Sequence, residues 1–331
     1  MSLFRPSPLK VCAGVYAVAF LAIVFHFYPS RTDPPEAIHF QPTPEQQEFY
    51  DAAFDAQQAR YEVIARRAAR EFHIREKVEE FAAVHHLSKA HVLDVGSGEG
   101  SLQDIVEDYT GLDISATARA KYHKRFVQAD ARAMPFLDGE FDAVWTIWVL
   151  EHVPNPEQAL REIRRVLRPG GLLYLSPAWL CSDLAPNGYP VRPYSDFGLK
   201  GKLIKASVPL QNTAAFQAMY MLPIRAARLA AWKLYHQPTT LHYRPIAANY
   251  QVYWMADSDA VNSIDMFEAY LWFRSRGDEC LNCPADSELI RTGSIPLVIR
   301  VKPQPHTSAL ADRRDCRKVA SPHDGGRDHC E

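Results

Sequence analysis

The chain has 331 residues, of which 47% are hydrophobic and 23% charged, and this balance is that of an ordinary globular protein. A net charge of −2 offers no basic footprint for nucleic acid, so nucleic acid is not an expected partner. Six cysteines are too few for a scaffold held together by disulfides.

The first feature along the chain is an apolar segment. Residues 1–10 carry Arg5 and Lys10, whereas residues 11–30 carry no charge and residues 11–28 are almost wholly apolar. About 18 to 20 such residues can span a bilayer. A cleaved signal peptide is the alternative, but residues 25–30 offer no small-x-small cleavage site. We therefore predict an uncleaved transmembrane anchor over residues 11–28.

Two segments lead from this anchor to the next strong motif. Residues 29–44 contain five prolines and little periodicity, which predicts a linker. In residues 45–87, Phe49, Tyr50, Tyr61 and Ile64 recur among charged residues at helical spacing. We therefore expect N-terminal helices there.

The most informative motif is the run from His91 to Gly100, which reads HVLDVGSGEG. Aliphatic residues lead into Asp94, and a glycine-rich loop follows. Gly96, Gly98 and Gly100 permit positive φ and leave no Cβ to block a ligand. This pattern is typical of a buried parallel strand that ends where a ligand approaches the backbone.

Two further acids end predicted strands. Asp113 lies 19 residues after Asp94 and closes the strand 109–113, a position that suits a ribose diol. Asp130 closes the strand 125–130. Because Ser101 stands where a dinucleotide site has its third glycine, we expect a ribose but no pyrophosphate. The alternatives are that Asp94 caps a helix and that Asp113 and Asp130 are turn residues.

The elements that follow identify a family. A strand begins at residue 141 and runs into the sequence WVLEHV, a helix covers residues 156–167, and Arg168-Pro-Gly-Gly leads into the strand 172–176. Together with the glycine loop and the three acids, this series resembles class I S-adenosylmethionine-dependent methyltransferases. The subgroup is methyltransferase type 11, which is related to the ubiquinone and menaquinone methyltransferases. The resemblance covers residues 88–178.

The resemblance implies a fold and a set of cofactor contacts. The fold is α/β, a Rossmann-like doubly wound and mostly parallel seven-stranded sheet with an antiparallel last strand. In this family the first loop holds the methionine part of S-adenosyl-L-methionine, which implicates Asp94, Gly96, Ser97, Gly98 and Gly100. Helices before the first strand often cover the cofactor or the substrate, although packing on the sheet is the alternative.

The other strand ends are implicated in the same way. Asp113, followed by Ile114, corresponds to the acid that binds both ribose hydroxyls. Asp130 corresponds to the acid that reaches the adenine amino group, with the backbone of Ala131 beside it. Thr146 and Ile147, which end the fourth strand, are expected to wall the cofactor near its sulfonium; these two follow from a weaker signal.

Glu151 and His152 follow the fourth strand, where the acceptor pocket of the family opens. Methyl transfer from a sulfonium depends mainly on alignment, and a base is needed only for a hydroxyl or an acidic carbon. His152 titrates in a useful range, so these two residues are our catalytic candidates. The alternative is that they orient the loop.

The remaining chain departs from the compact core. Residues 179–247 mix basic and aromatic side chains, which suits a membrane interface or an amphiphilic acceptor, or else a helix that covers the core. Residues 248–302 are predicted to complete the fold with strands at 250–255 and 296–301 and a helix at 264–276. Residues 303–331 are predicted to be disordered.

No metal site is predicted. Cys280 and Cys283 have half the spacing of a zinc site, and without further ligands we expect free thiols. Asp257 and Asp259 could hold a metal that binds a diol, but a turn is the favoured interpretation.

The sequence thus predicts a membrane-anchored methyltransferase that acts on a lipid, a quinone-like compound or a lipid-linked glycan. The count of Lys and Arg around the anchor weakly places the enzyme outside the cell. Because S-adenosylmethionine is kept inside cells, we instead expect a single-pass membrane protein whose catalytic domain faces the cytoplasm. The alternatives are a soluble small-molecule or protein acceptor, a cofactor-binding scaffold without catalysis and, more remotely, an NAD-dependent oxidoreductase.

Overall fold

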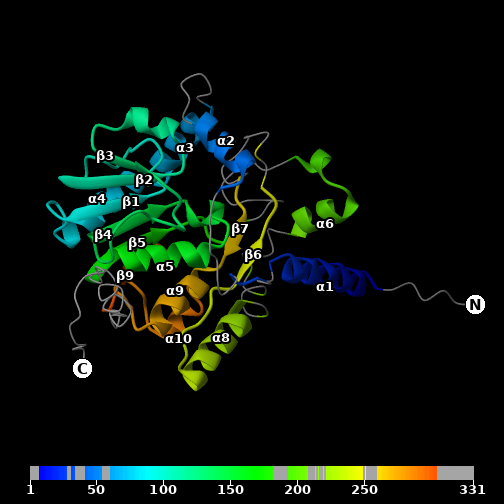
Figure 1. Ribbon diagram of the computed structural model, residues 1–331. Coiled ribbons are helices and arrows are strands. Elements are labelled where there is room, and N and C mark those ends of the chain that lie inside the picture. The colour runs from blue at the N-terminus through cyan, green and yellow to red at the C-terminus, as the bar shows by residue number, and fades with distance from the viewer. Residues whose placement is uncertain are drawn as a thin grey trace, which may run out of the picture.

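The computed structural model describes residues 7–27, 31–33, 42–53, 60–181, 193–207, 213, 215, 219, 221–248, 250 and 259–303. Its centre is a twisted seven-stranded sheet with helices on both faces (Figure 1). The predicted strand at 250–255 and the predicted disordered tail at 303–331 fall almost entirely outside the described residues.

The large sheet has the strand order β3-β2-β1-β4-β5-β9-β8. Neighbouring strands from β3 to β5 are parallel, whereas β9 is antiparallel to both β5 and β8. The predicted mostly parallel sheet with an antiparallel last strand is therefore confirmed. The strands are β1 (His91–Val95), β2 (Asp108–Asp113), β3 (Arg125–Gln128), β4 (Phe141–Ile147), β5 (Leu167–Ser176), β8 (Glu279–Cys280) and β9 (Leu297–Arg300).

The helices are spread along the whole chain. Their bounds are α1 (Pro8–Phe27), α2 (Pro44–Ala53), α3 (Arg60–Glu71), α4 (Ile74–Val84), α5 (Pro156–Val166), α6 (Leu199–Ser207), α8 (Leu222–Tyr235), α9 (Met266–Ser275) and α10 (Asp286–Leu289). Short 3₁₀ turns are η1 (Thr117–Lys121), η2 (Leu150–His152) and η3 (Tyr194–Asp196).

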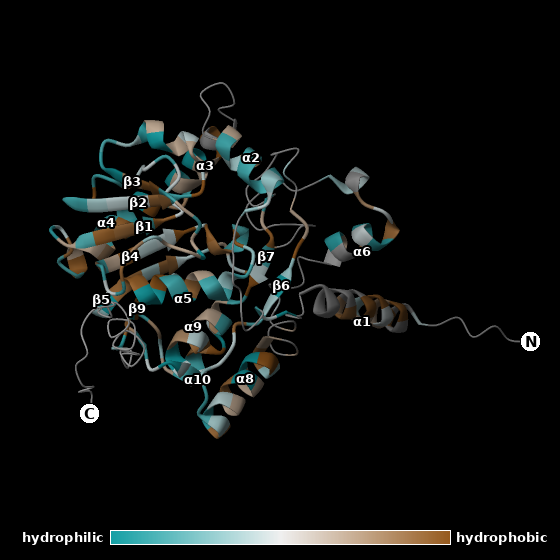
Figure 2. Ribbon diagram, viewed as in Figure 1, coloured by the Kyte–Doolittle hydropathy of each residue, from teal (hydrophilic) through white to brown (hydrophobic). Residues whose placement is uncertain are grey.

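Alternation along the strands divides the core into two layers. Leu93 and its same-face neighbours pack with α5 and α9, whereas Val92 and Trp145 face the opposite side and pack with Phe81 of α4. The hydropathy colouring accordingly shows apolar strands between helices with polar outer faces (Figure 2). Burial of both faces holds the strand ends in fixed positions, and the functional cavity lies at those ends.

The predicted basic and aromatic insert contributes α6, α8 and one strand of a two-stranded sheet. Strands β6 (Tyr243–Pro245) and β7 (Asn262–Ile264) pair antiparallel, and Arg31 forms a backbone bridge with Tyr243. Arg225 of α8 is only 3% exposed and donates to both carboxylate oxygens of Asp265, at 2.9 and 2.7 Å. This basic residue therefore fastens α8 to the start of α9 instead of facing a membrane.

The predicted transmembrane anchor is wrong. In the described part of the chain, no helix combines the length and the hydropathy that a bilayer crossing requires. Helix α1 lies alongside α6 (Figure 1). The expected single-pass membrane location is corrected together with the anchor.

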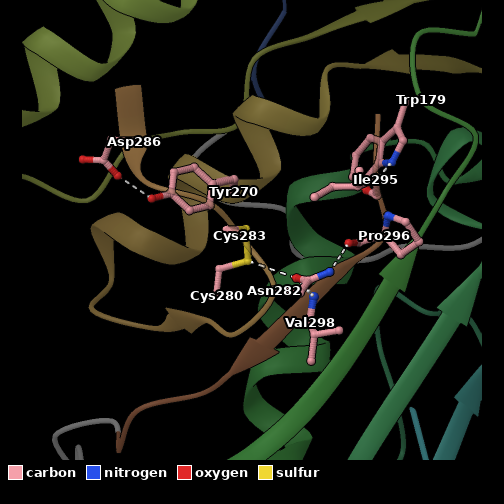
Figure 3. Close-up of a disulfide and its surroundings, with 9 residues drawn as sticks. All are labelled: Trp179, Tyr270, Cys280, Asn282, Cys283, Asp286, Ile295, Pro296 and Val298. Carbon is pink, nitrogen blue, oxygen red and sulfur yellow. Dashed lines mark hydrogen bonds between the residues drawn. A yellow bond between two sulfur atoms is a disulfide. The ribbon is translucent and has the colours of Figure 1, made fainter. Parts of the chain in front are cut away.

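The two cysteines that were expected to be free thiols form a disulfide, Cys280–Cys283, with a Cα–Cα distance of 5.4 Å (Figure 3). Asn282 of this loop donates to the carbonyl of Pro296 at 2.8 Å and accepts from the amide of Val298 at 2.9 Å. These bonds fix the loop against β9, which brings the two sulfur atoms together. No group of three metal-ligating side chains occurs among the described residues.

Candidate functional site

A cavity of about 720 Å³ opens where β1, β2 and β4 end at their carboxyl edge. Its floor consists of the loops that follow these strands, and its walls come from α2, α3 and the start of α4. In an open parallel sheet this edge is where ligands bind. The volume lies within the range of small-molecule sites.

The loop after β1 takes a form that only glycine fits well. Gly96 and Gly98 have φ values of +70° and +52°. A Cβ at Gly96 would collide with the side chain of Val149, which follows β4. Residues 96–107 form turns instead of a helix, so no helix N-terminus faces the loop to hold a pyrophosphate.

Asp94, the residue before the last one of β1, is buried. Its side chain is 3% exposed, and its Oδ2 accepts a hydrogen bond from the Tyr109 hydroxyl at 2.8 Å. Burial raises the pKa of Asp94 to about 7, the Tyr109 hydrogen bond lowers it in part, and the charge of Asp113 adds to the increase. A cation placed beside Asp94 would therefore favour the ionised form.

Asp113 ends β2 and holds the glycine loop. Its Oδ2 accepts from the amide of Gly98 at 2.9 Å, and its Oδ1 accepts from the amide of Ser115 at 2.9 Å. Burial raises the pKa of Asp113, and these backbone bonds oppose the increase. Each carboxylate oxygen retains a lone pair, so a vicinal diol could still donate to both.

Asp130 follows β3 and is committed to an ion pair. Both its oxygens accept from Arg132, with Nε–Oδ1 at 2.9 Å and Nη2–Oδ2 at 2.6 Å. Arg132 is 5% exposed and also donates to the carbonyl of Pro154 at 3.2 Å. The pair fixes the β3 edge of the cavity relative to the loop after β4, a contact that the sequence did not reveal.

His152 lines the cavity and lies in a cluster of buried polar groups. Its Nδ1 is 3.2 Å from Oδ2 of Asp259, and the same oxygen accepts from the Tyr50 hydroxyl at 2.6 Å. The sequence pattern predicts only that Tyr50 lies in a helix and that Asp259 lies in a turn. No local signal could have joined them, because these two residues are 209 positions apart.

Glu151 does not line the cavity. Its Oε1 accepts from the amide of Ala178 at 3.0 Å, and its main-chain carbonyl accepts from Val261 at 2.7 Å. Burial raises the pKa of Glu151, and the charge of His152 counteracts the increase. The side chain thus joins the loop after β4 to neighbouring segments, which is the role given above as the alternative to catalysis.

Helix α2 covers the cavity and is joined to two of its loops. Gln46 donates to the carbonyl of His152 at 3.0 Å, and Gln47 donates to the carbonyl of Ile114 at 2.9 Å. Asp51 accepts from the amide of Ala116 at 2.8 Å. Helix α2 therefore lies where a helix before the first strand was expected, over the site.

The structure brings most of the predicted site residues together. Those that line the cavity are Asp94, Gly96, Ser97, Gly98, Asp113, Ile114, Asp130, Ala131, Ile147 and His152. Three predicted residues do not line it: Gly100, Thr146 and Glu151. Gly100 lies against Tyr122, whose ring would be 2.8 Å from an added Cβ, and Thr146 is 1% exposed within β4.

Comparison with known proteins agrees with this geometry. Residues 93–175 match the model of a family described as a methyltransferase domain. The chain carries a methyltransferase domain. The expected family and its cofactor, S-adenosyl-L-methionine, are thereby confirmed for this domain, which contains the loop after β1 and all three strand-end acids.

Several named proteins resemble the methyltransferase domain and its surroundings. A sterol 24-C-methyltransferase of Gibberella zeae is 29% identical over 188 residues, covering 51% of this chain and 45% of that protein. A ubiquinone/menaquinone biosynthesis C-methyltransferase of Hahella chejuensis is 44% identical over 80 residues, covering 24% and 32%. The chain thus spans less than half the length of these two relatives.

Solved structures are more distant. A SAM-dependent methyltransferase of Thermotoga maritima is 22% identical and covers 39% of this chain and 60% of its own, with a TM-score of 0.31. A likeness of this size carries no argument about function.

Proposed function

We propose that this protein transfers a methyl group from S-adenosyl-L-methionine to an apolar acceptor, a lipid, a quinone-like compound or a lipid-linked glycan. One observation carries the proposal: a single cavity connects the carboxylates of Asp94 and Asp113 with the imidazole of His152. One end of this cavity suits an adenosine with a cationic tail, and the other suits a group that loses a proton.

The residues of the first end fit the cofactor. Asp94 is a buried acid that a nearby cation would stabilise, which suits the charged methionine part beside Gly96 and Gly98. The remaining lone pairs of Asp113 suit the two ribose hydroxyls. When bound, the cofactor supplies an electrophilic methyl group, and its sulfur keeps the electron pair of the bond that breaks. Asp130 would contact the edge of the adenine while it remains in its ion pair with Arg132.

Apolar side chains form the part of the wall that we assign to the acceptor: Trp148, Val149 and Val153 after β4, and Ile74 of α4. Charged side chains of α3 and α4, such as Arg66, Arg70 and Arg75, line the same cavity. The ring of Phe72, at the end of α3, lies 5.7 Å from that of Trp148 in an edge-to-face arrangement. Trp148 has a φ of +55°, and strain of this kind in a bulky residue is concentrated at functional sites. These surfaces favour a flat or chain-like hydrophobic acceptor.

In this proposal, His152 acts as the base. An acceptor hydroxyl or acidic carbon becomes nucleophilic when its proton leaves, and we assign the imidazole of His152, which lines the cavity, to accept that proton. The glycine loop and α2 hold the reactants and exclude water. Alignment of the reactants supplies much of the remaining rate enhancement.

The relatives suggest, but do not identify, the acceptor. One is named for a sterol and another for ubiquinone and menaquinone, and both names describe hydrophobic compounds. A third, a malonyl-[acyl-carrier protein] O-methyltransferase of Enterobacter lignolyticus, is 30% identical over 158 residues and covers 40% of this chain and 63% of that protein. Its name keeps open the alternative of a soluble small-molecule or protein acceptor.

The test is transfer of a labelled methyl group. Purified full-length protein is incubated with methyl-labelled S-adenosylmethionine and with organic-solvent and aqueous extracts of cells, each in a separate reaction. We expect label in the lipid fraction, and we expect Asp113→Ala to abolish it by weakening the ribose contacts. Label confined to the aqueous fraction would support the soluble acceptor. Cofactor binding by calorimetry with no transfer to any extract would support the scaffold.

A further inference from the structure

The surroundings of His152 involve three distant parts of the chain. His152 ends η2, Tyr50 lies on α2, and Asp259 lies in the segment that leads to β7. Asp259 is 1% exposed, and its Oδ2 is 2.6 Å from the Tyr50 hydroxyl and 3.2 Å from Nδ1 of His152. The rings of Tyr50 and His152 are 6.4 Å apart and nearly perpendicular.

The contact between Nδ1 of His152 and Oδ2 of Asp259 is an ion-pair contact at 3.2 Å without hydrogen-bond geometry, and its charge favours one form of the imidazole. A carboxylate beside Nδ1 stabilises a proton on that nitrogen, so Nε2 becomes the nitrogen that can accept a proton. The Tyr50 hydroxyl donates to the same carboxylate oxygen and holds it in place. A buried carboxylate next to an imidazole also stabilises the imidazolium that forms when Nε2 is protonated.

Other charged and titratable groups face this cluster. Glu151 Oε1 lies 3.8 Å from Nε2 of His152. Burial and the charge of Asp259 raise the pKa of Tyr250, which therefore stays protonated near neutral pH. Arg132 lines the same cavity, but its charge is matched by Asp130. The two carboxylates nearest the imidazole are thus Asp259 at Nδ1 and Glu151 near Nε2.

We propose that Asp259 and Tyr50 are positioning residues, which fix the tautomer of His152 and make the base dependent on the docking of α2. This inference rests on the proposed function. In the step it concerns, the bond between the acceptor atom and its hydrogen breaks, the electron pair remains on the acceptor atom to form the new bond to carbon, and the proton goes to Nε2. Because Tyr50 belongs to α2, the helix that covers the cavity also completes the base.

A matched control exists elsewhere in the chain. Tyr270 donates to Oδ1 of Asp286 at 2.6 Å, the same length as the bond from Tyr50 to Asp259 (Figure 3). Neither control residue lines the cavity. The variants Tyr270→Phe and Asp286→Asn therefore remove an equivalent bond without touching the proposed base.

The experiment measures the tautomer directly. Nitrogen NMR of the imidazole in full-length protein is recorded for wild type, Asp259→Asn, Tyr50→Phe and the two controls, with His152→Gln identifying the signal. We expect wild type and both controls to carry the proton on Nδ1, and Asp259→Asn to lose this preference. An unchanged tautomer in Asp259→Asn would overturn the proposal.

Activity and binding then separate this inference from the proposed function. With labelled cofactor and lipid extract, Asp259→Asn should lower kcat by about tenfold or more, approaching the loss of about 100-fold expected for His152→Gln. The pH at which its rate rises should shift, and cofactor affinity by calorimetry should stay within about twofold of wild type. A change in KM alone, or an equal loss in the controls, would contradict a positioning role. If wild type transfers no label, the proposed function fails, while the tautomer measurement still decides this inference.

Discussion

The Tyr109 hydroxyl of β2 donates to Oδ2 of Asp94 on β1 across 2.8 Å, so two neighbouring parallel strands are joined at an acid that lines the cavity. The bond partly stabilises a buried charge, but burial remains the larger effect, and the pKa of Asp94 stands at about 7. Because Asp94 is partly protonated near neutral pH, a cation that binds beside it should lower its pKa and release its proton.

The first prediction concerns stability and pH in the cofactor-free protein. Between about pH 4 and pH 7, Asp94 keeps its proton in the folded protein but has lost it in the unfolded chain. The contribution of Asp94 to the free energy of unfolding is therefore fully present below pH 4 and is lost as the pH rises through 7. A pKa raised to about 7 corresponds to a contribution of about 4 kcal/mol. Asp94→Asn should therefore match wild type at pH 4 and exceed its free energy of unfolding at pH 8, as measured with urea.

A companion variant checks the cause. The Tyr109 hydrogen bond lowers the pKa of Asp94, so Tyr109→Phe should move the midpoint of the wild-type pH dependence upward. Cofactor binding should release a proton near pH 6.5, which is detectable as a dependence of the binding enthalpy on buffer ionisation. An enthalpy independent of buffer would show that no cation reaches Asp94.

A second prediction concerns the glycine loop. Gly96→Ala should lower both the free energy of unfolding and cofactor affinity, because alanine at φ +70° costs about 1–2 kcal/mol and its Cβ collides with Val149. Gly139→Ala is the control, since φ there is +69° and the nearest atom to an added Cβ is 3.5 Å away. Thermal unfolding and calorimetry compare the two variants. If both variants lose the same stability and affinity, close packing of Val149 against Gly96 is not the cause.

A third prediction tests the apolar end of the cavity. Trp148→Gly removes the ring and relieves the positive φ, so the fold should be retained. We expect KM for the lipid acceptor to rise by about tenfold or more, as the loss of a buried aromatic contact implies. Cofactor affinity should change little. Should KM stay at its wild-type value, Trp148 would not contact the acceptor.

A fourth prediction concerns the disulfide. It closes a loop of only four residues, for which chain entropy allows about 2 kcal/mol of stabilisation. The variant Cys280→Ser with Cys283→Ser should therefore unfold at a slightly lower temperature. Because neither cysteine lines the cavity, its cofactor affinity should equal that of wild type. A large loss of affinity would instead connect this loop to the site.

The sequence predicted those parts of the site that are local. Asp94, Gly96 and Gly98 are contiguous with a buried strand, and Asp113 ends the next strand at the expected spacing. Parallel pairing of β1 and β2 then places these acids at one edge, so their proximity followed from the fold class. The mostly parallel sheet with an antiparallel last strand was predicted from the resemblance to the methyltransferase family.

Long-range contacts were not predictable in this way. Tyr50 and Asp259 meet only because α2 and the segment before β7 both pack against the loop after β4. The ion pair between Arg132 and the carboxylate of Asp130 could not be predicted from the sequence either. The predicted membrane anchor is wrong although its segment is apolar, and the disulfide depended on a loop that Asn282 holds.

The attachments of α2 have a kinetic consequence. Gln46 and Gln47 bond to the carbonyls of His152 and Ile114, which lie on opposite loops of the cavity. If a bulky molecule enters between these loops, both bonds break as it passes and reform once it is inside. We therefore expect ordered binding of cofactor and acceptor and ordered release of the products. The demethylated cofactor should dissociate slowly, and its release should limit the turnover rate.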